Sequence, residues 1–456
     1  MLRSLIAGQG GVLETALQVE TADSLLLTGV RIGVPELPGV WMFDLNWVRL
    51  TEADDGSIDV ELPEIIETRS SSQDGTGIFG VLSTSGQNGR FTADETGMNL
   101  SLSGALLQIS DGLQDRRTGD VIHVQESSRN WSLTVDAPVV ESNDLTASFT
   151  AQEHIITETA EGGTVFAQLG VHDGIEIGYQ GQFRDIFNAF DDLSDIRNHS
   201  RWVNADSLKG VLQLTGGAQL AFDSGDVHLS VRSSAETFKV SLQLGGTATQ
   251  VIAGGFVQDS FQFSELRSEM ELGLVPIGDS IRVSLRIGLS DLEVNPELIA
   301  MFAASSAAVS DGDHPPGHFR FEGSLEVPVE HVAEAHLDQR RLVETPENFV
   351  VVINSLHLSL LGAEMIVSGE ISGSVGDGLE PVPLPFGEIR GELKNVKAMI
   401  EYLNSLGAIT NEGRLGMAIV LGIGRAKGDD HYSYEIQFAG DNGITVNGVT
   451  FLSGIR

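Results

Sequence analysis

The sequence predicts a mainly β protein, built from a large curved antiparallel sheet or sheets with a few amphipathic helices packed on the apolar face. Apolar and polar residues alternate along much of the 456-residue chain, as in strands with one buried and one solvated face. The chain contains 53 Gly but only 13 Pro, a composition that suits many strands joined by turns. Helical periodicity is confined to a few short segments.

Strand signals recur along the chain. Residues 43–47 alternate apolar and polar side chains, and the Asp-Asp-Gly sequence at 54–56 then predicts a turn. The longest alternation spans residues 281–289. Strands that are apolar on one side and polar on the other are typical of an antiparallel sheet with one buried face. Further strands are predicted at 58–62, 98–103, 131–135, 238–244, 266–274 and 349–353.

Residues 432–451 predict a closing hairpin. The apolar side chains at 432, 434, 436 and 438 alternate with polar ones. Asn442-Gly443 supplies the positive φ angles that a tight hairpin turn requires, and Asn447-Gly448 offers a second reversal. We expect the apolar side of this hairpin to pack on the helix that precedes it at 396–403.

Helices are predicted near 183–193 and 295–303, with a helical pair near 394–424, because apolar residues there recur at spacings of three and four. The acidic and Pro-containing segment 310–317 has the composition of a joint. We therefore expect a large antiparallel β region at 1–310. A second β region, at 311–456, would contain the helical pair and the closing hairpin.

Charge and composition exclude several classes of function. The net charge is −37, which repels phosphate backbones and anionic lipid headgroups, so we expect no nucleic-acid partner. The chain has no Cys, which removes disulfides, thiolate metal sites and cysteine nucleophiles. No run of about 18 apolar residues is present in the sequence, so no membrane-spanning segment is predicted.

Motifs for catalysis, metals and cofactors are weak, and we predict no catalytic residue, metal site or cofactor. The sequence lacks Gly-x-Ser-x-Gly, the signature of a nucleophile elbow. His331 and His336 are five residues apart, which suits a solvated helix face better than a zinc site. The segment 311–318 carries Asp and His but reads better as a polar linker. The Gly-rich segment 422–428 reads better as a helix end than as a phosphate loop.

The chain resembles DUF2125, an uncharacterised family of alphaproteobacterial periplasmic proteins, most clearly in its last third and more weakly at residues 27–32. The resemblance rests on "VVVINSLHLSLLGAEMIVSGEIS", "GEIRGELKNVKAMIEYLNSLG" and the ending "YEIQFAGDNGITVNGVTF". It implies a periplasmic location and supplies no catalytic residues. The first eleven residues are not typical of a signal peptide, so this location is inferred from the resemblance. In architecture the chain also resembles β-rich envelope proteins of the AsmA type, which are associated with phospholipid passage.

These observations favour a non-enzymatic cell-envelope protein that binds a lipid or another apolar ligand in a groove of the sheet. Alternatives are a scaffold protein of an envelope assembly, with a stable protein partner, and an enzyme such as a glycosidase. The sequence leaves open whether the apolar sheet face is accessible or fully packed. The residues that we expect to line the groove are Phe43, Leu45, Trp47, Phe261 and Phe263.

Overall fold

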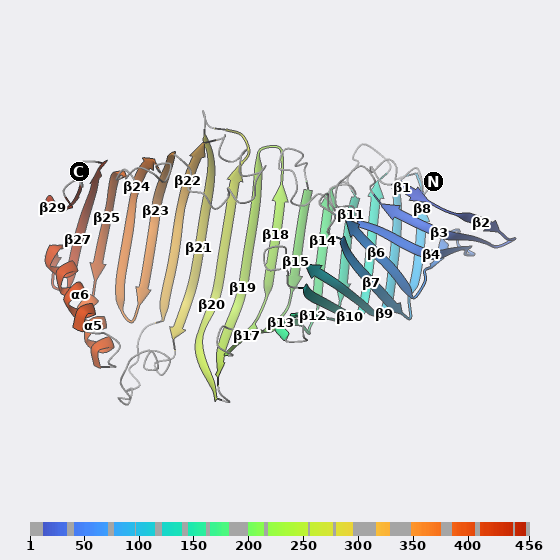
Figure 1. The fold of residues 1–456 in the computed structure, drawn as a ribbon, viewed down its shortest axis with the longest axis horizontal. Coiled ribbons are helices and arrows are strands. Elements are labelled where there is room, and N and C mark those ends of the chain that lie inside the picture. Colours follow the sequence, from blue (N-terminus) through green and yellow to red (C-terminus); the bar gives the residue numbers. More distant parts are fainter. Residues whose placement is uncertain are drawn as a thin grey trace. The chain divides into compact units, whose positions relative to one another are not determined.

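A computed structural model of the chain shows a mainly β protein, which confirms the predicted fold class (Figure 1). Its described strands pair antiparallel and are assigned to one large sheet. The chain divides into unit 1, Met1–Ser234 with Ile252–Gly255, and unit 2, Ala235–Val251 with Phe256–Arg456. The structure describes residues 12–33, 41–71, 77–95, 97–114, 121–138, 145–160, 165–181, 199–213, 218–253, 256–276, 280–294, 316–328, 348–374, 385–405, 411–440 and 443–452.

Unit 1 consists of strands in the residues that the structure describes. They are β1 (Val12–Glu14), β2 (Leu17–Glu20), β3 (Ser24–Gly33), β4 (Trp41–Glu52), β5 (Ile58–Glu61), β6 (Ile65–Ser71), β7 (Gly77–Ser85), β8 (Asn88–Ala93), β9 (Gly97–Gln114), β10 (Val121–Pro138), β11 (Leu145–Ala151), β12 (Glu153–Ala160), β13 (Val165–Val171), β14 (Ile175–Gly181), β15 (His199–Ala205), β16 (Leu208–Gln213), β17 (Gln219–Ser224) and β18 (Val227–Ser233). The turn expected at 54–56 joins β4 to β5. The helix predicted near 183–193 lies outside the described residues.

Long strands of unit 1 face pairs of shorter strands that follow each other in the chain. The first half of β10 pairs with β12 and its second half with β11, while Gln152 links the two. The same arrangement occurs where β9 meets β7 and β8, and where β4 meets β5 and β6. Asn130 in β10 has a φ of 47°, and Gly86 between β7 and β8 has a φ of 61°. The cross-strand register continues without a shift on both sides of these positions, so each interruption is a local change of backbone conformation without an inserted residue.

The core of unit 1 lies beside these interruptions. Leu27 and Val30 flank Gly29 in β3, and they share one core cluster with Leu45 and Val48 of β4. Residues three apart in a regular strand point to opposite faces. Gly29 has a φ of 57°, so the alternation is broken there and both flanking side chains reach the same core. Other buried residues three apart flank similar interruptions: Ser128 and Trp131, Ala151 and His154, and Ser224 and Val227.

Two aromatic rings of unit 1 lie over glycines on neighbouring strands. Trp131 is the cross-strand partner of Gly104, and Trp202 is the partner of Gly178. A Cβ atom added at position 178 would lie 1.9 Å from Cε2 of Trp202. The glycines therefore leave room for the indole rings to lie flat on the sheet, an arrangement that stabilises glycine-containing strands. These two tryptophans thus pack against the neighbouring strands of unit 1.

Unit 2 is a sheet of long strands with a helical pair at one end (Figure 1). Residue 310, the predicted domain boundary, falls in unit 2 outside the described residues, as does the helix predicted near 295–303. The described elements are β19 (Thr237–Ala253), β20 (Phe256–Gly273), β21 (Ser280–Val294), β22 (Gly317–Pro328), β23 (Asn348–Leu360), β24 (Ala363–Ser374), β25 (Phe386–Lys394), α5 (Val396–Ser405), α6 (Asn411–Ile423), β26 (Arg425–Gly428), β27 (His431–Ala439), β28 (Ile444–Val446) and β29 (Val449–Leu452).

The end of unit 2 corresponds closely to the predicted elements. The helical pair expected near 394–424 corresponds to α5 and α6, and the closing hairpin corresponds to β27, β28 and β29. Gly443 has a φ of 99°, and Asn447 and Gly448 have φ angles of 51° and 81°. Positive φ at both central residues is the geometry of a type I′ turn, which reverses the chain between β28 and β29.

Candidate functional site

The predicted groove residues fall in both units, and each set is described within its own unit. In unit 1, Leu45 is buried in the core with Val30 and Val48. The Arg49 guanidinium carbon lies 5.8 Å from the centre of the Trp47 ring, which is half-buried. Phe43 belongs to β4, but its side chain lies outside the described residues.

In unit 2 the structure brings Phe261 and Phe263 together. Their ring centres are 6.5 Å apart and the rings are nearly parallel. Phe263 is buried and Phe261 is half-buried. The hydroxyl of Thr249 donates a hydrogen bond to the carbonyl oxygen of Phe261 at 2.8 Å. The pair is thus held by β19 and stabilises the β19–β20 region.

A larger apolar surface, which sequence reasoning did not select, crosses unit 2 from β20 to β27. Cross-strand partners form four rows over seven strands, and we call this surface the apolar face. The rows are Leu266, Leu289, Phe319, Leu358, Met365, Leu393 and Tyr432; Ser268, Ile287, Phe321, Leu356, Val367, Gly391 and Tyr434; Met270, Leu285, Gly323, Ile353, Gly369, Ile389 and Ile436; and Leu272, Val283, Leu325, Val351, Ile371, Gly387 and Phe438.

The apolar face is only partly covered by the described residues. None of its aliphatic or aromatic side chains is buried, and Met270 is 38% exposed. The described apolar residues of unit 2 that are buried are Phe263, Ile281, Val327, Ala363 and Val396. An apolar sheet face normally packs against a second layer. Here the described elements that could cover it are α5 and α6, which contact the Tyr432 and Tyr434 end.

The opposite face of β20, β21 and β22 is charged. The carboxylate of Glu269 in β20 accepts a hydrogen bond from Lys239 Nζ at 2.7 Å. It also forms an ion pair with Arg286 Nη1 of β21 at 3.1 Å. These contacts lower the pKa of Glu269, chiefly through the hydrogen bond from Lys239. Arg286 also reaches Glu322 of β22 at 3.5 Å. Alternation along each strand therefore separates a charged, solvated surface from the apolar face.

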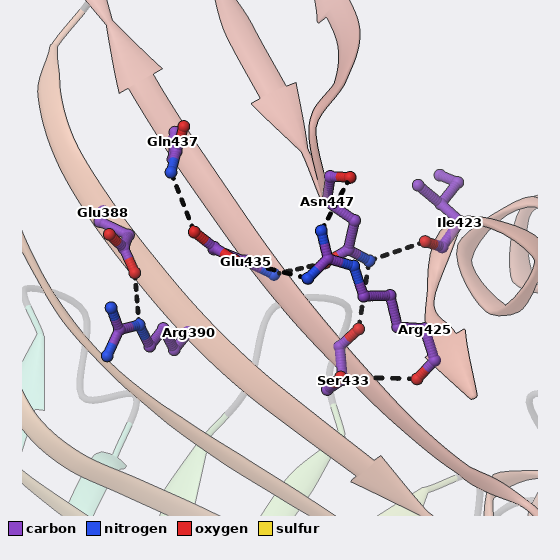
Figure 2. A network of polar contacts seen from close by, with 8 residues as sticks. All are labelled: Glu388, Arg390, Ile423, Arg425, Ser433, Glu435, Gln437 and Asn447. Carbon is purple, nitrogen blue, oxygen red and sulfur yellow. Dashed lines mark hydrogen bonds and ion pairs between the residues drawn. The ribbon is translucent and has the colours of Figure 1, made fainter. Parts of the chain in front are cut away.

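The edge of β27 beyond the apolar face is completed by Asn447 (Figure 2). Strand β26 pairs with residues near the start of β27 and β28 with residues near its end, which leaves a gap at Glu435. The Oδ1 atom of Asn447 accepts from the backbone N–H of Glu435 at 2.9 Å. Its Nδ2 atom donates to the carbonyl oxygens of Ile423 at 2.8 Å and Ser433 at 3.2 Å. Asn447 thus ties the end of α6 to β27.

The helical pair is anchored to the apolar face by two tyrosines. The hydroxyl of Tyr434 donates to the carbonyl oxygen of Val420 in α6 at 3.1 Å. Lys397 of α5 lies 5.8 Å from the centre of the Tyr432 ring. The hairpin was expected to pack on α5, yet Tyr434 contacts α6. The reason is that α6 leads directly into β26, which pairs with β27.

Metal and nucleotide chemistry gains no support within the described residues. They contain no group of three or more His, Asp and Glu side chains that could hold a metal ion. The His331–His336 and 311–315 segments lie outside the described residues. The segment 422–428 contains the end of α6 and strand β26, as expected for a helix end. Within the same part of the chain, no helix combines the length and apolar character that crossing a bilayer requires.

No family model, curated protein or solved structure matches the chain. The apolar face is therefore the candidate site on physical grounds. Its signal was present in the sequence as the alternation at 281–289, 349–353 and 432–438. What the sequence did not contain was the register, which decides that these alternations share one face.

Proposed function

We propose that the protein is a non-enzymatic cell-envelope protein that binds lipid acyl chains, or a similar apolar ligand, along the apolar face of unit 2. The observation that carries this proposal is the incomplete burial of four rows of mainly apolar residues across seven strands. An apolar surface of this extent on a soluble protein commonly marks an interaction site.

The dimensions of the apolar face suit an acyl chain. Strands are about 4.8 Å apart, so seven strands span about 29 Å. The hydrocarbon part of one bilayer leaflet is about 15 Å deep. An extended acyl chain therefore fits within the width of the apolar face. An acyl chain lying on the apolar face would be stabilised by about 25 cal/mol for each Å² of apolar surface that is removed from water. The charged opposite face offers little apolar surface to bury, so we expect the acyl chain to bind only to the apolar face.

The periplasmic location remains part of the proposal. It is supported by the resemblance to the periplasmic DUF2125 family. It is also supported by the architectural resemblance to AsmA-type envelope proteins, which are associated with phospholipid passage. The acidic composition is compatible with this location. Cell fractionation with a tagged chromosomal copy tests it, and recovery in the cytoplasm would contradict it.

Native mass spectrometry after detergent-free purification tests ligand binding. We expect a population of protein that carries additional mass, which organic extraction identifies as lipid. The variant Leu285→Glu places a charge in the middle of the apolar face and should abolish the additional mass. The control Ser284→Glu changes the adjacent residue on the charged face and should retain it. A ligand-free mass in every preparation of wild-type protein would refute the proposal.

The alternative is a scaffold whose partner protein covers the apolar face. It predicts a stable complex and no lipid. Affinity capture of the tagged protein from detergent-solubilised envelope, compared between wild type and Leu285→Glu, distinguishes the two. A stoichiometric protein lost only in Leu285→Glu, without bound lipid in wild type, would favour the scaffold.

A further inference from the structure

Helix α6 differs from an ordinary surface helix in composition. Residues 415–423 read Leu-Gly-Met-Ala-Ile-Val-Leu-Gly-Ile and include no polar side chain. A surface helix normally carries polar residues on its outward side, whereas a helix that is apolar all round is buried in a core or a membrane. Neighbouring α5 follows the ordinary pattern: Val396 is buried, and Lys397, Glu401 and Asn404 are exposed.

The outward side of α6 is accessible. Leu415 is 65% exposed, and Ile419 and Val420 are 49% and 46% exposed. Met417 and Leu421 are half-buried on the other side. Leu415 and Ile419 are four residues apart, so they lie one above the other on one face of the helix. This outward apolar stripe is defined by Leu415, Ile419 and Val420.

The orientation of the stripe is fixed by the end of the helix. The last carbonyl groups of a helix lack partners within it. In α6, the carbonyl of Val420 accepts from the Tyr434 hydroxyl and that of Ile423 accepts from Asn447 Nδ2. These bonds attach the end of α6 to β27. The stripe is thus held outward by a rigid contact.

The segment 394–428, which contains the helical pair and basic residues of β25 and β26 on either side of it, is net positive within a strongly acidic chain. The whole chain has a net charge of −37, and three of its five Lys residues lie in the segment 394–428. Asp429 and Asp430 follow, yet the segment stays net positive when they are included. Asp430 also accepts from the backbone N–H of Lys397 at 2.9 Å, which places its charge at the start of α5. The charged residues of 394–428 are Lys394, Lys397, Arg414, Arg425 and Lys427 against Glu401 and Glu412.

The basic side chains nearest the end of α6 remain accessible although they form ion pairs. The Arg425 side chain is 61% exposed and lies 3.8 Å from Glu435. The Lys427 side chain is 49% exposed and lies 2.6 Å from Glu392. Exposed pairs of this kind are weak, so both cations can also interact with an anionic surface.

We propose that α6 is an interfacial helix that docks on an anionic lipid surface. Its 13 residues correspond to about 20 Å, which is too short to span the hydrocarbon core of about 30 Å. The stripe enters the boundary between headgroups and acyl chains, while the basic residues contact the headgroups. The excess of basic residues in the segment 394–428 complements anionic headgroups. The proposal concerns α6 and does not depend on ligand binding by the apolar face.

Vesicle flotation tests the docking. Purified protein is mixed with vesicles of phosphatidylcholine alone or of phosphatidylcholine with phosphatidylglycerol. We expect the wild type to float with the anionic vesicles and to bind the neutral ones at least about fivefold more weakly. Salt at about 0.5 M shortens the range of charge interactions to a few Å, so it should reduce flotation.

Matched variants locate the contact. Leu415→Gln with Ile419→Gln keeps good helix formers and should reduce flotation about tenfold with an unchanged melting temperature. The control Val275→Gln replaces another exposed apolar residue of unit 2, at 58% exposure, and should float as the wild type does. Equal flotation of the double variant and the wild type would overturn the proposal.

Size-exclusion chromatography tests whether a second copy of the protein, and not a lipid surface, covers the stripe. A dimer of the wild type that the double variant converts to a monomer would show that a second copy covers the stripe, and it would also overturn the proposal. A monomer in both, with flotation lost only in the double variant, supports docking on lipid. Because the test uses intact vesicles, its failure would leave the native mass measurement of a bound ligand unaffected.

Discussion

Asn447 provides both hydrogen bonds that a strand neighbour would give to Glu435. Its backbone N–H donates to the carbonyl oxygen of Glu435 at 2.8 Å, and its side-chain Oδ1 accepts from the N–H of Glu435 at 2.9 Å. A single residue therefore closes the gap between β26 and β28 on the edge of β27. Exposed sheet edges pair readily with other chains, so this contact protects the edge as well as holding α6.

The variant Asn447→Gly should destabilise the protein by about 1–3 kcal/mol, because it removes three side-chain hydrogen bonds and leaves Glu435 N–H without that partner. Glycine retains the φ of 51° without strain. The free energy of unfolding is measured by urea denaturation. Hydrogen exchange should become faster in residues 415–423, since α6 loses its attachment.

Asn395→Gly is the matched control for this prediction. Asn395 also has a positive φ, of 56°, but its side chain donates one bond, to the carbonyl of Gly362 at 3.2 Å. We expect a loss below about 1 kcal/mol. Equal losses in the two variants would contradict the assigned role of Asn447.

Gly178→Ala should lower the free energy of unfolding by about 1–3 kcal/mol, because its Cβ would meet the Trp202 ring at 1.9 Å and force the indole to move. Tryptophan fluorescence should shift to longer wavelength as the ring becomes more solvated. Gly288→Ala is the control, since no atom lies within 4 Å of a Cβ at that position. A Gly178→Ala protein as stable as this control would show that the ring does not need the glycine.

His154 should make unit 1 sensitive to acid. Its Nδ1 lies 2.8 Å from Oγ of Ser128, both residues are buried, and burial lowers the pKa of His154 below 6.5. The unfolded chain therefore binds a proton at a higher pH than the folded chain does. The stabilising contribution is complete above pH 6.5 and declines as pH falls below it, by up to about 1.4 kcal/mol per pH unit.

The comparison with His154→Gln isolates this effect. Most carboxylates titrate below about pH 5, so the difference between the two proteins should change between about pH 6.5 and 5. Chemical denaturation at a series of pH values measures it. A constant difference across this range would mean that His154 is not held neutral in the folded protein.

The sequence predicted the elements better than their arrangement. The alternation at 281–289 correctly identified β21, and the positive φ of Gly443 follows from local chemistry. The interruptions of unit 1 escaped prediction because buried pairs such as Leu27 and Val30 break the period of two. That spacing of three is itself a signal that the alternation is interrupted.

The candidate site was less predictable because it depends on long-range register. Phe261 and Phe263 were predicted to line a groove and both lie on β20, whereas the apolar face collects residues from seven strands up to 172 positions apart, from Leu266 to Phe438. A one-residue change of register would send any of these strands' side chains to the opposite face. Local sequence does not fix that choice. The bridging role of Asn447 likewise depends on partners 12, 14 and 24 residues away.

Site-specific photo-crosslinking tests the central claim, lipid binding on the apolar face, most directly. A photoreactive amino acid is placed at Leu285, whose cross-strand partners are Met270 and Gly323, or at Ser284, whose partners are Glu271 and Ser324. The two positions are adjacent but face opposite sides of the sheet. After illumination in cells, we expect a lipid adduct at position 285 and none at 284. Adducts at both positions, or at neither, would contradict the account.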